Sequence, residues 1–511
     1  MAFCSVLFQE PGEGITRENA EAPAFFSDLN LDQVINAIAA GKEEYDLKPF
    51  FYTPLHTVDA IEYRHEIMRD LENEVIFKHI KSFERNMRAM REHLTQVEKL
   101  HYSSQKKRWF LDAVEMYCHA VIRLAHDLGS ANIRSSGLSS FLAYLRGYVD
   151  SDRFTTLMAE TKRLQSDLST VKYTILIDGS RVRVRRYESE SDYSAEVEQA
   201  FEKFKQDGVK DYRVEFLDSP DMNHVEARIL DLVSQLYLDI FSRLDGFCAR
   251  NVHYADETVT VFEREIQFYV SYLEHIALLK REGLKFCYPQ ISDKSKEVSN
   301  VEGFDMALAY KLHRDGSHVV VNDFSLKDKE RIFIVSGPNQ GGKTTFARTF
   351  GQLHYLGSIG CPVPGSQARL FLHDGLFTQF ENEENIKNLR GKLQDDLVRI
   401  HDILNRSTPD SIIIMNEIFT STTLKDAIFL SKEILEKIIQ SDNLCVYVTF
   451  LDELASLSEK AVSMVSTVTP EDPTIRTFKI LRKPADGLAH AISIAKKYRL
   501  TYNRVMERIK P

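Results

Sequence analysis

An apolar run that leads into a glycine-rich loop is the feature that most constrains the fold of this chain of 511 residues. Ile332–Ser336 is strand-like and is followed directly by Gly337-Pro338-Asn339-Gln340-Gly341-Gly342-Lys343-Thr344, with a helical pattern from Thr345. This order and spacing is that of a phosphate-binding loop between a strand and a helix. The glycines let backbone N–H groups point at phosphates, and the helix directs the positive end of its dipole at the same charge.

These residues predict a site for ATP with Mg²⁺. Lys343 is expected to reach the β- and γ-phosphate oxygens, and the Thr344 hydroxyl to bind Mg²⁺, which takes few protein ligands. Pro338, Asn339, Gln340 and the glycines of the loop, together with Thr345, complete the predicted nucleotide contacts.

A second apolar run, 411–415, ends in the polar pair Asn416 and Glu417. Phosphate-loop enzymes place an acidic pair at this point, in which one carboxylate supports the Mg²⁺ shell and the other orients the attacking water. Asn416 can still bind Mg²⁺ through water but brings no charge. Glu417 is predicted to be catalytic together with Lys343, and the alternative is that Glu417 only caps the end of a strand.

The length exceeds that at which one hydrophobic core stops growing, so several structural units are expected. Up to about Gly283 the pattern is mainly helical, with an N-cap predicted at Thr57 and an apolar seam along 259–276. That seam fits packing within the chain or an intermolecular coiled coil. After Gly283, apolar strands at 332–335, 370–371, 376–380, 412–415 and 444–449 alternate with helices, which predicts a largely parallel sheet covered on both faces.

The stretch 173–187 departs from the helical pattern, because β-branched and apolar residues flank Asp178-Gly179. This predicts a small β-hairpin. Arg181, Arg183 and Arg185 alternate with valines and therefore share one strand face, with Arg186 beside them. The four arginines are a candidate nucleic-acid-binding strip, and the alternative is a solvated strand face.

Composition excludes few functions. The formal net charge of −10 argues against a uniformly basic surface but leaves room for a local basic strip. The first residues lack a basic segment followed by a long apolar one, and no apolar run approaches a membrane span, so a cytoplasmic protein without a membrane partner is expected. The six cysteines are scattered without a paired spacing, which predicts reduced thiols.

The loop and the motifs after it resemble the MutS family of DNA mismatch repair ATPases, which belong to the ABC-type P-loop ATPases. GPNQGGKTT at 337–345 is similar to the family's GPNMGGKST, and 414–418 resembles the start of LMDEIGRGTST. The segments 356–364 and 448–454 resemble its IGxxVP turn and ATHYHEL segment, and 485–491 resembles a C-terminal element near the dimer interface. Asn322 matches an Asn at the family's nucleotide pocket.

The resemblance implies a multidomain fold: an all-α lever and core domain with a small β-containing insertion, then an α/β P-loop ATPase domain of the ABC type. The predicted ranges are an N-terminal segment at 1–30, helical core and lever at 31–171, a clamp-like insertion at 172–222, further lever helices at 223–290, and the ATPase domain at 291–511. It also implies a homodimer that acts on DNA. Only a short segment precedes the lever region, so the chain is expected to lack the mismatch-recognition and connector domains. Phe8-Gln9-Glu10 spells the family's mismatch wedge, but Phe8 is expected to lack the folded platform that a wedge needs.

Three departures from the family fall on groups near the reacting phosphate: Asn416 replaces Asp, Phe450 replaces a His, and Gly391 replaces a Ser. Because electrostatic contacts at the phosphoryl group supply most of the rate, slow hydrolysis is expected. The predicted function is a nucleotide-switched DNA-binding ATPase that does not itself read mismatches. The alternatives are a nucleotide-stabilised scaffold with little hydrolysis and an RNA- or ribosome-directed relative.

Overall fold

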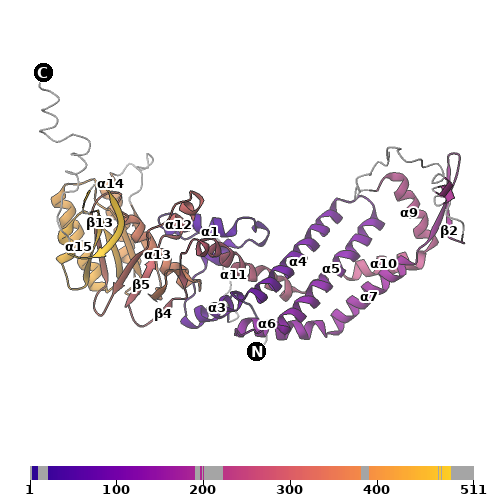
Figure 1. Cartoon of the computed structure of the whole chain (residues 1–511), viewed down its shortest axis with the longest axis horizontal. Coiled ribbons are helices and arrows are strands. Elements are labelled where there is room, and N and C mark those ends of the chain that lie inside the picture. Colours follow the sequence, from indigo (N-terminus) through magenta and orange to yellow (C-terminus); the bar gives the residue numbers. More distant parts are fainter. Residues whose placement is uncertain are drawn as a thin grey trace, which may run out of the picture. The chain divides into compact units, whose positions relative to one another are not determined.

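The computed structural model describes residues 3–9, 21–189, 196–197, 199–200, 222–380, 391–469, 471–472 and 475–484. They fall into two compact units (Figure 1). The first unit comprises Met1–Phe3, Asn73–Ile133 and Ser139–Glu263, and the second comprises Cys4–Glu72, Arg134–Leu138 and Arg264–Pro511. Residues 31–72 thus belong to the same unit as the C-terminal sheets. The five predicted domain ranges stay a prediction.

Long helices build the first unit, and α4 lies alongside α5 in an antiparallel pair (Figure 1). The helices that lie wholly or partly in this unit are α4 Glu74–Lys99, α5 Ser103–Ser130, α6 Ser136–Val149, α7 Asp152–Ser169, α9 His224–Leu236, α10 Leu238–Arg250 and α11 Glu257–Arg281. Side-chain caps start several of them: Asn73 accepts a hydrogen bond from Val75 N, and Ser151 accepts one from Phe154 N. Within the described residues no helix is both long and apolar enough to cross a bilayer.

The predicted hairpin is confirmed as β1 Tyr173–Asp178 and β2 Arg181–Arg186, which pair antiparallel with Asp178 opposite Arg181. The turn itself is Gly179-Ser180, one residue later than the Asp-Gly signal suggests. Gly179 has φ 58°, a left-handed conformation that glycine adopts without steric cost. A glycine at the first turn position suits the right-handed twist of the two strands.

A six-stranded sheet is the centre of the second unit, with strand order β10-β11-β12-β7-β13-β14. Its strands are β7 Ile332–Ser336, β10 Leu376–Phe380, β11 Ile412–Asn416, β12 Leu444–Val448, β13 Ala461–Val468 and β14 Arg476–Arg482. All neighbours pair parallel except β13 and β14. The predicted strands at 332–335, 376–380, 412–415 and 444–449 and their largely parallel arrangement are therefore confirmed. The predicted strand at 370–371 belongs instead to a separate four-stranded sheet, as part of Gln367–Phe371.

Helices cover both faces of this sheet, as predicted (Figure 1). Side chains alternate along β7: Phe333 meets Phe346 and Phe350 of α13 Lys343–Ser358, with ring centroids 5.9 Å apart in each case. Ile332 and Ile334 point to the other face and join a buried cluster with α14 Lys392–Arg406 and α15 Leu424–Ser441. The loop that joins β7 to α13 therefore lies at the carboxyl edge of a two-sided core, where parallel α/β sheets bind ligands.

Smaller elements complete the second unit. Two further sheets have the orders β4-β9-β5-β6 and β3-β8. Their strands and the remaining elements are β3 Phe286–Cys287, β4 Gln290–Ser292, β5 Val298–Gly303, β6 Asn322–Leu326, β8 Val363–Pro364, β9 Gln367–Phe371, α1 Leu31–Ala39, α2 Lys48–Tyr52, α3 Val58–Leu71, α12 Met306–Arg314, and the 3-10 turns η2 Ala24–Phe26, η3 Glu43–Tyr45 and η4 Asp452–Ser456. Thr57 is the N-cap of α3, as predicted, and its side chain accepts a hydrogen bond from Ala60 N.

Residues 5–8 are buried in the second unit. Glu265 of α11 accepts hydrogen bonds from Ser5 Oγ at 2.8 Å and from Val6 N at 2.9 Å. Phe8 is buried and lies 5.3 Å from the guanidinium carbon of Arg64. The expectation that Phe8 has no folded platform is wrong, because α3 and α11 supply one. A buried Phe8 is, however, no base-inserting wedge.

The apolar seam of α11 lies inside the protein, which favours the first of the two interpretations of that pattern. Val259, Phe262, Ile266, Tyr269 and Ile276 all have no exposed surface. Phe262 stacks on Phe141 within the first unit, with ring centroids 3.5 Å apart. A seam buried in this way is core packing rather than a surface for another chain.

Candidate functional site

The glycine-rich loop is shaped by its own glycines and by a serine on β13. Gly337 and Gly342 have φ values of 118° and 92°, which glycine adopts readily. A Cβ atom on Gly341 would come within 2.2 Å of the Ser466 hydroxyl oxygen. That hydroxyl donates a 2.7 Å hydrogen bond to Gly341 O. Ser466 therefore supports the loop from behind, a contact that no motif in the sequence predicts.

The loop delivers the N-terminus of α13 to the edge of the sheet. Gly342 is the N-cap of this helix and offers no side-chain hydrogen bond to the first turn. The free N–H groups of a first helical turn, together with the helix dipole, favour an anion. Among the loop residues, Pro338 and Gly341 are buried, whereas Asn339 and Gln340 are exposed.

Lys343 is folded back along the loop and is only 3% exposed. Its Nζ donates hydrogen bonds to Gly337 O at 3.1 Å and Pro338 O at 3.3 Å, and contacts Asn339 Oδ1 at 3.4 Å. It also lies 3.3 Å from Glu417 Oε1. Burial lowers the pKa of Lys343 below its usual range, while the Glu417 carboxylate acts in the opposite direction.

The polar pair at the end of β11 meets the loop, as the sequence predicts. Thr344 Oγ1 donates a 2.9 Å hydrogen bond to Asn416 Oδ1, so the two predicted Mg²⁺ ligands are neighbours. Glu417 has φ 53°, an uncommon value for a residue with a side chain, and its N–H donates to Val448 O. This backbone conformation lets the Glu417 carboxylate reach Lys343.

Phe450 covers the same lysine from the other side. Lys343 Nζ lies 4.4 Å from the centroid of the Phe450 ring, which is itself 49% exposed. An ammonium group at this distance from an aromatic ring is attracted by the negative face of the ring. Lys343, Thr344, Asn416, Glu417 and Phe450 therefore form one cluster around the loop.

Asn322 lies beside the loop, but its side chain is engaged by β14. Its Nδ2 donates to Phe478 O at 3.1 Å, and its Oδ1 accepts from Ile480 N at 2.8 Å. Phe478 O in turn lies 3.7 Å from the position of a Cβ atom on Gly342. Asn322 therefore holds β14 against the start of α13. Thr345 is half-buried in the first turn of α13 and accepts a hydrogen bond from Thr349 through its carbonyl.

Other predicted residues lie elsewhere or outside the described part of the chain. Gly391 is the N-cap of α14, and a Cβ atom there would meet nothing within 4 Å. Residues 388–390 of the segment around it, and the predicted C-terminal element at 485–491, lie outside the described residues.

The arginines of the hairpin divide between its two faces. Arg181, Arg183 and Arg185 share one face, because they pair with Asp178, Leu176 and Thr174, respectively. Arg186 belongs to the opposite face. Its Nε donates to Leu236 O at 3.2 Å, and its guanidinium carbon lies 4.8 Å from the centroid of the Tyr237 ring.

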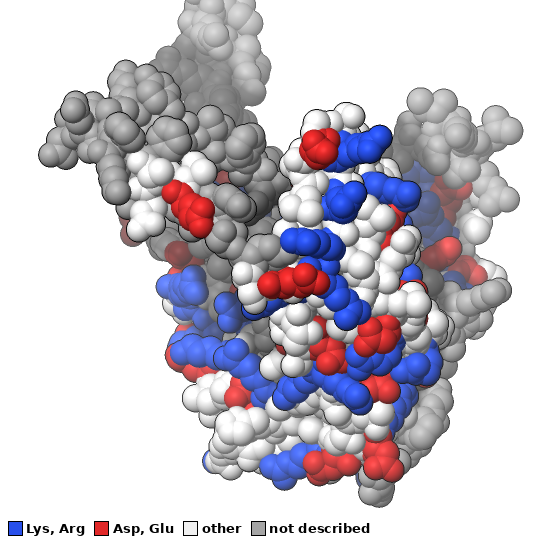
Figure 2. Space-filling model, turned by 90° about the vertical axis from the view of Figure 1, so that its right-hand side faces the viewer, with Lys and Arg blue, Asp and Glu red and all other residues white. Residues whose placement is uncertain are grey.

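Arg186 therefore anchors the base of the hairpin, and all four arginines are exposed. Figure 2 looks onto the end of the molecule where the hairpin lies and shows Lys and Arg side chains gathered on this surface, with Asp and Glu among them.

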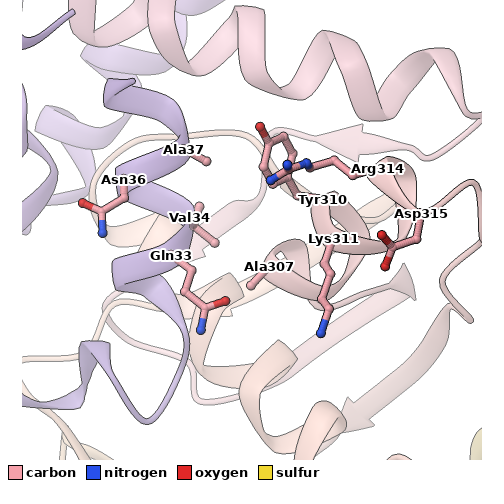
Figure 3. A pocket seen from close by; sticks show the side chains of 9 residues that line it. All are labelled: Gln33, Val34, Asn36, Ala37, Ala307, Tyr310, Lys311, Arg314 and Asp315. Carbon is pink, nitrogen blue, oxygen red and sulfur yellow. The ribbon is translucent and has the colours of Figure 1, made fainter. Parts of the chain in front are cut away.

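A separate hollow of about 690 Å³ lies between α1 and α12 (Figure 3). It is lined by Gln33, Val34, Asn36, Ala37, Ala307, Tyr310, Lys311, Arg314 and Asp315. The hollow mixes both signs of charge, and none of the predicted site residues lines it. Within the described residues, no group of three or more His, Cys, Asp or Glu side chains is arranged to hold a metal ion.

Comparison with known proteins identifies the C-terminal part of the chain. Residues 333–508 match the family model of MutS domain V. The DNA mismatch repair protein MutS of Orientia tsutsugamushi (strain Boryong) is 27% identical over 230 residues, which are 43% of this chain and 26% of that protein. Msh3 of Mus musculus is 26% identical over 185 residues, 36% of this chain and 17% of that protein. MutS of Ruminiclostridium cellulolyticum is 25% identical over 289 residues, 54% of this chain and 32% of that protein.

The fold of the second unit and this match define the class: a multidomain α/β protein with a domain of the MutS domain V type. Residues 333–508 are therefore similar to domain V of MutS proteins, and the relatives that the chain matches are DNA mismatch repair proteins. Its matches span about a third or less of the length of these relatives.

Proposed function

We propose that this protein binds ATP and DNA, switches as a homodimer with its bound nucleotide, and hydrolyses ATP slowly. The observation that carries the proposal is the cluster at the glycine-rich loop. Lys343 lies 3.3 Å from Glu417, and Thr344 lies 2.9 Å from Asn416, so residues from two strand ends meet at one helix N-terminus. This combination of donors suits a phosphate chain with its metal ion.

Each group has a distinct role in this proposal. The N–H groups of Gly337 and of residues 339–343, together with the dipole of α13, hold the phosphates, and the Lys343 ammonium neutralises the transferred group. Glu417 orients the attacking water and accepts its proton. The Thr344 hydroxyl and, through water, the Asn416 amide would hold Mg²⁺, which screens the phosphate charge when it is bound.

The same cluster supports slow turnover. Asn416 offers a neutral oxygen where the family has a carboxylate, and Phe450 presents an apolar ring at Lys343. Gly391 has no side chain to offer to a neighbouring subunit. A site that lacks several charged or hydrogen-bonding contacts stabilises the transition state less and turns over more slowly.

The exposed Arg181 and Arg183 of the hairpin are the proposed DNA contacts. Guanidinium groups bind phosphates regardless of base sequence, so this strip supplies affinity rather than a sequence code.

The direct test is ATP binding by the purified protein and its Lys343→Ala variant. We expect wild-type protein to bind ATP with Mg²⁺ and the variant to lose at least about tenfold in affinity, because one buried charge contact to phosphate is removed. Lys329→Ala is the control, since Lys329 is exposed and pairs with the exposed Glu459. Equal ATP affinity of wild type and Lys343→Ala, with both folded by circular dichroism, would end the proposal.

A competing function is a scaffold whose dimer is stabilised by ATP with little hydrolysis, which the neutral Asn416 favours. Single-turnover hydrolysis by wild type and Glu417→Gln, with and without DNA, separates the two. A measurable rate that Glu417→Gln abolishes while ATP still binds excludes the pure scaffold. Stimulation by RNA but not by DNA would instead support an RNA- or ribosome-directed relative.

A further inference from the structure

The hairpin has an apolar face as well as a basic one, and the apolar face is exposed at the tip. Ile177 pairs with Val182, and Ile175 pairs with Val184, so the four aliphatic side chains share one face. Ile177 is 75% exposed, the highest value for any large apolar side chain in the described residues, while Val182 is 43% exposed. Aliphatic side chains that lie next to one another on an exposed strand face form an apolar patch, and such patches are typical of surfaces that contact another molecule.

The hairpin is fixed at its base and narrow at its tip. Tyr237 Oη donates to Lys172 O at 2.5 Å, Arg186 Nε donates to Leu236 O, and α9 lies against β2 (Figure 1). The turn at the other end has two residues, Gly179 and Ser180. A two-stranded ribbon is slim enough to enter the major groove of DNA, which is about 12 Å wide.

Charge identifies the occupant. Residues 172–188 carry five cationic side chains and only two acidic ones. The cationic residues are Lys172, Arg181, Arg183, Arg185 and Arg186, and the acidic residues are Asp178 and Glu188. Arg181 is adjacent to the tip and Arg183 follows on the same face, with the apolar pair on the reverse of the same two strands. A polyanion whose interior is apolar matches this combination, and a nucleic acid with exposed base steps is such a molecule.

We propose that the Ile177–Val182 pair inserts at a weakly stacked base step of DNA, while Arg181 and Arg183 hold the flanking phosphates. The inference rests on the proposed DNA-binding function and adds what that function leaves open, namely the structure of DNA that is preferred. Inserting an aliphatic wedge requires bases to unstack, and unstacking is easiest at a branch or at a junction of single and double strands. The hairpin therefore selects DNA by its deformability rather than by its base sequence.

The experiment uses the full chain and two DNAs, a fluorescent-labelled homoduplex and a branched duplex with 2-aminopurine at the branch point. For wild type we expect tighter binding to the branched DNA and a rise in 2-aminopurine fluorescence, since that base brightens when it unstacks. The Ile177→Asn variant should lose the rise and bind the branched DNA about tenfold more weakly, with affinity for homoduplex changed less than about twofold.

Leu176→Asn is the matched control. It also replaces an aliphatic side chain of β1 by asparagine, but Leu176 precedes Ile177 and lies on the arginine face of the hairpin. It should retain the fluorescence rise. If both variants lose the fluorescence rise equally, or if Ile177→Asn keeps it, the proposed insertion of the Ile177–Val182 pair is wrong. Circular dichroism of each variant reports whether the fold is kept, and Val182→Thr supplies a milder change on the wedge if Ile177→Asn is unfolded.

The outcomes also separate this inference from the proposed function. Binding of both DNAs by wild type without preference or fluorescence change overturns the wedge alone. If Arg181→Ala with Arg183→Ala leaves all binding intact, the proposed phosphate contacts are wrong, and with them the wedge. No binding to any nucleic acid overturns both proposals, and capture of a protein by the same tip in its place would identify a protein interface.

Discussion

At the scale of single residues, the site depends on a neutral amide where a carboxylate would bring charge. Asn416 Oδ1 accepts from Thr344 Oγ1 at 2.9 Å and sits beside Glu417 at the end of β11. An aspartate has the same shape and keeps this acceptor. Asn416→Asp therefore changes the charge at the predicted metal position while it keeps the shape of the side chain.

Asn416→Asp should lower the Mg²⁺ concentration needed for half-maximal ATP hydrolysis by about tenfold, because a full negative charge is added near the cation. The measurement is a Mg²⁺ titration of single-turnover hydrolysis. Asn405→Asp serves as the control, since Asn405 is exposed on α14. An unchanged Mg²⁺ requirement in Asn416→Asp would place the metal ion away from this residue.

The contact between Gly341 and Ser466 makes a second prediction at this scale. Gly341→Ala should lower the free energy of unfolding by about 1–3 kcal/mol, because its Cβ would overlap Ser466 Oγ and approach Pro338 O at 2.9 Å. The free energy is measured by urea unfolding, together with ATP affinity, which should fall. Gly147→Ala on α6 is the comparison, since a Cβ there meets nothing within 4 Å. Equal behaviour of the two alanine variants would rule out the support by Ser466.

At the scale of elements, α13 is held at the end opposite to the loop by a fully buried arginine. Arg64 of α3 has no exposed surface, and its Nη1 donates to Ile359 O at the C-cap of α13 at 2.8 Å. Its Nε donates to Leu7 O at 3.0 Å. The N-terminal segment, α3 and the loop helix therefore share one side chain.

Arg64→Met should lower the free energy of unfolding by about 3 kcal/mol, because two buried carbonyls lose their donor. Arg69→Met tests the specificity of this effect on the same helix. Arg69 is half-exposed, pairs with Glu62 at 3.8 Å and lies 4.5 Å from the centroid of the Tyr288 ring, so its loss should cost about 1 kcal/mol. Chemical unfolding of both variants measures the difference, and similar losses would contradict the role given to Arg64.

The elements of the main sheet could be predicted from the sequence, whereas several contacts between elements could not. The strands of the main sheet are apolar runs bounded by polar residues, and their local pattern was sufficient to place them. Ser466, Arg64 and the buried Phe8 were missed, because each acts through a partner more than fifty residues away, and no local pattern carries that information. Thr344 and Asn416 were found together because both stand at strand or helix ends whose meeting the parallel topology dictates.

At the scale of the whole molecule, four buried histidines make the second unit sensitive to acid. Burial lowers the pKa values of His65 and His354 to about 3, and those of His275 and His373 to about 4. In the unfolded chain these histidines bind a proton near pH 6.5, whereas in the folded unit they stay neutral to a much lower pH. The free energy of unfolding therefore falls as the pH drops below about 6.5.

Each histidine contributes up to about 1.4 kcal/mol per pH unit between its unfolded and folded pKa. Burial raises the pKa values of Glu265 and Asp305 in the same unit. These carboxyl groups take up protons more readily in the folded state than in the unfolded chain, so their protonation at low pH stabilises the fold and offsets part of this loss. We expect the melting temperature to fall between pH 7 and pH 5. His354→Gln should reduce that fall, and an equal fall in wild type and variant would contradict the assignment.

The buried segment at Ser5–Phe8 has a consequence for how the chain is made. Ser5 and Glu265 are 260 positions apart in the sequence, and residues 73–263 belong almost entirely to the other unit. During synthesis the apolar Val6, Leu7 and Phe8 leave the ribosome long before α11 can receive them. The first unit can therefore fold while the second still waits for its final strands, and those early residues stay open to chaperones until the two ends of the second unit meet.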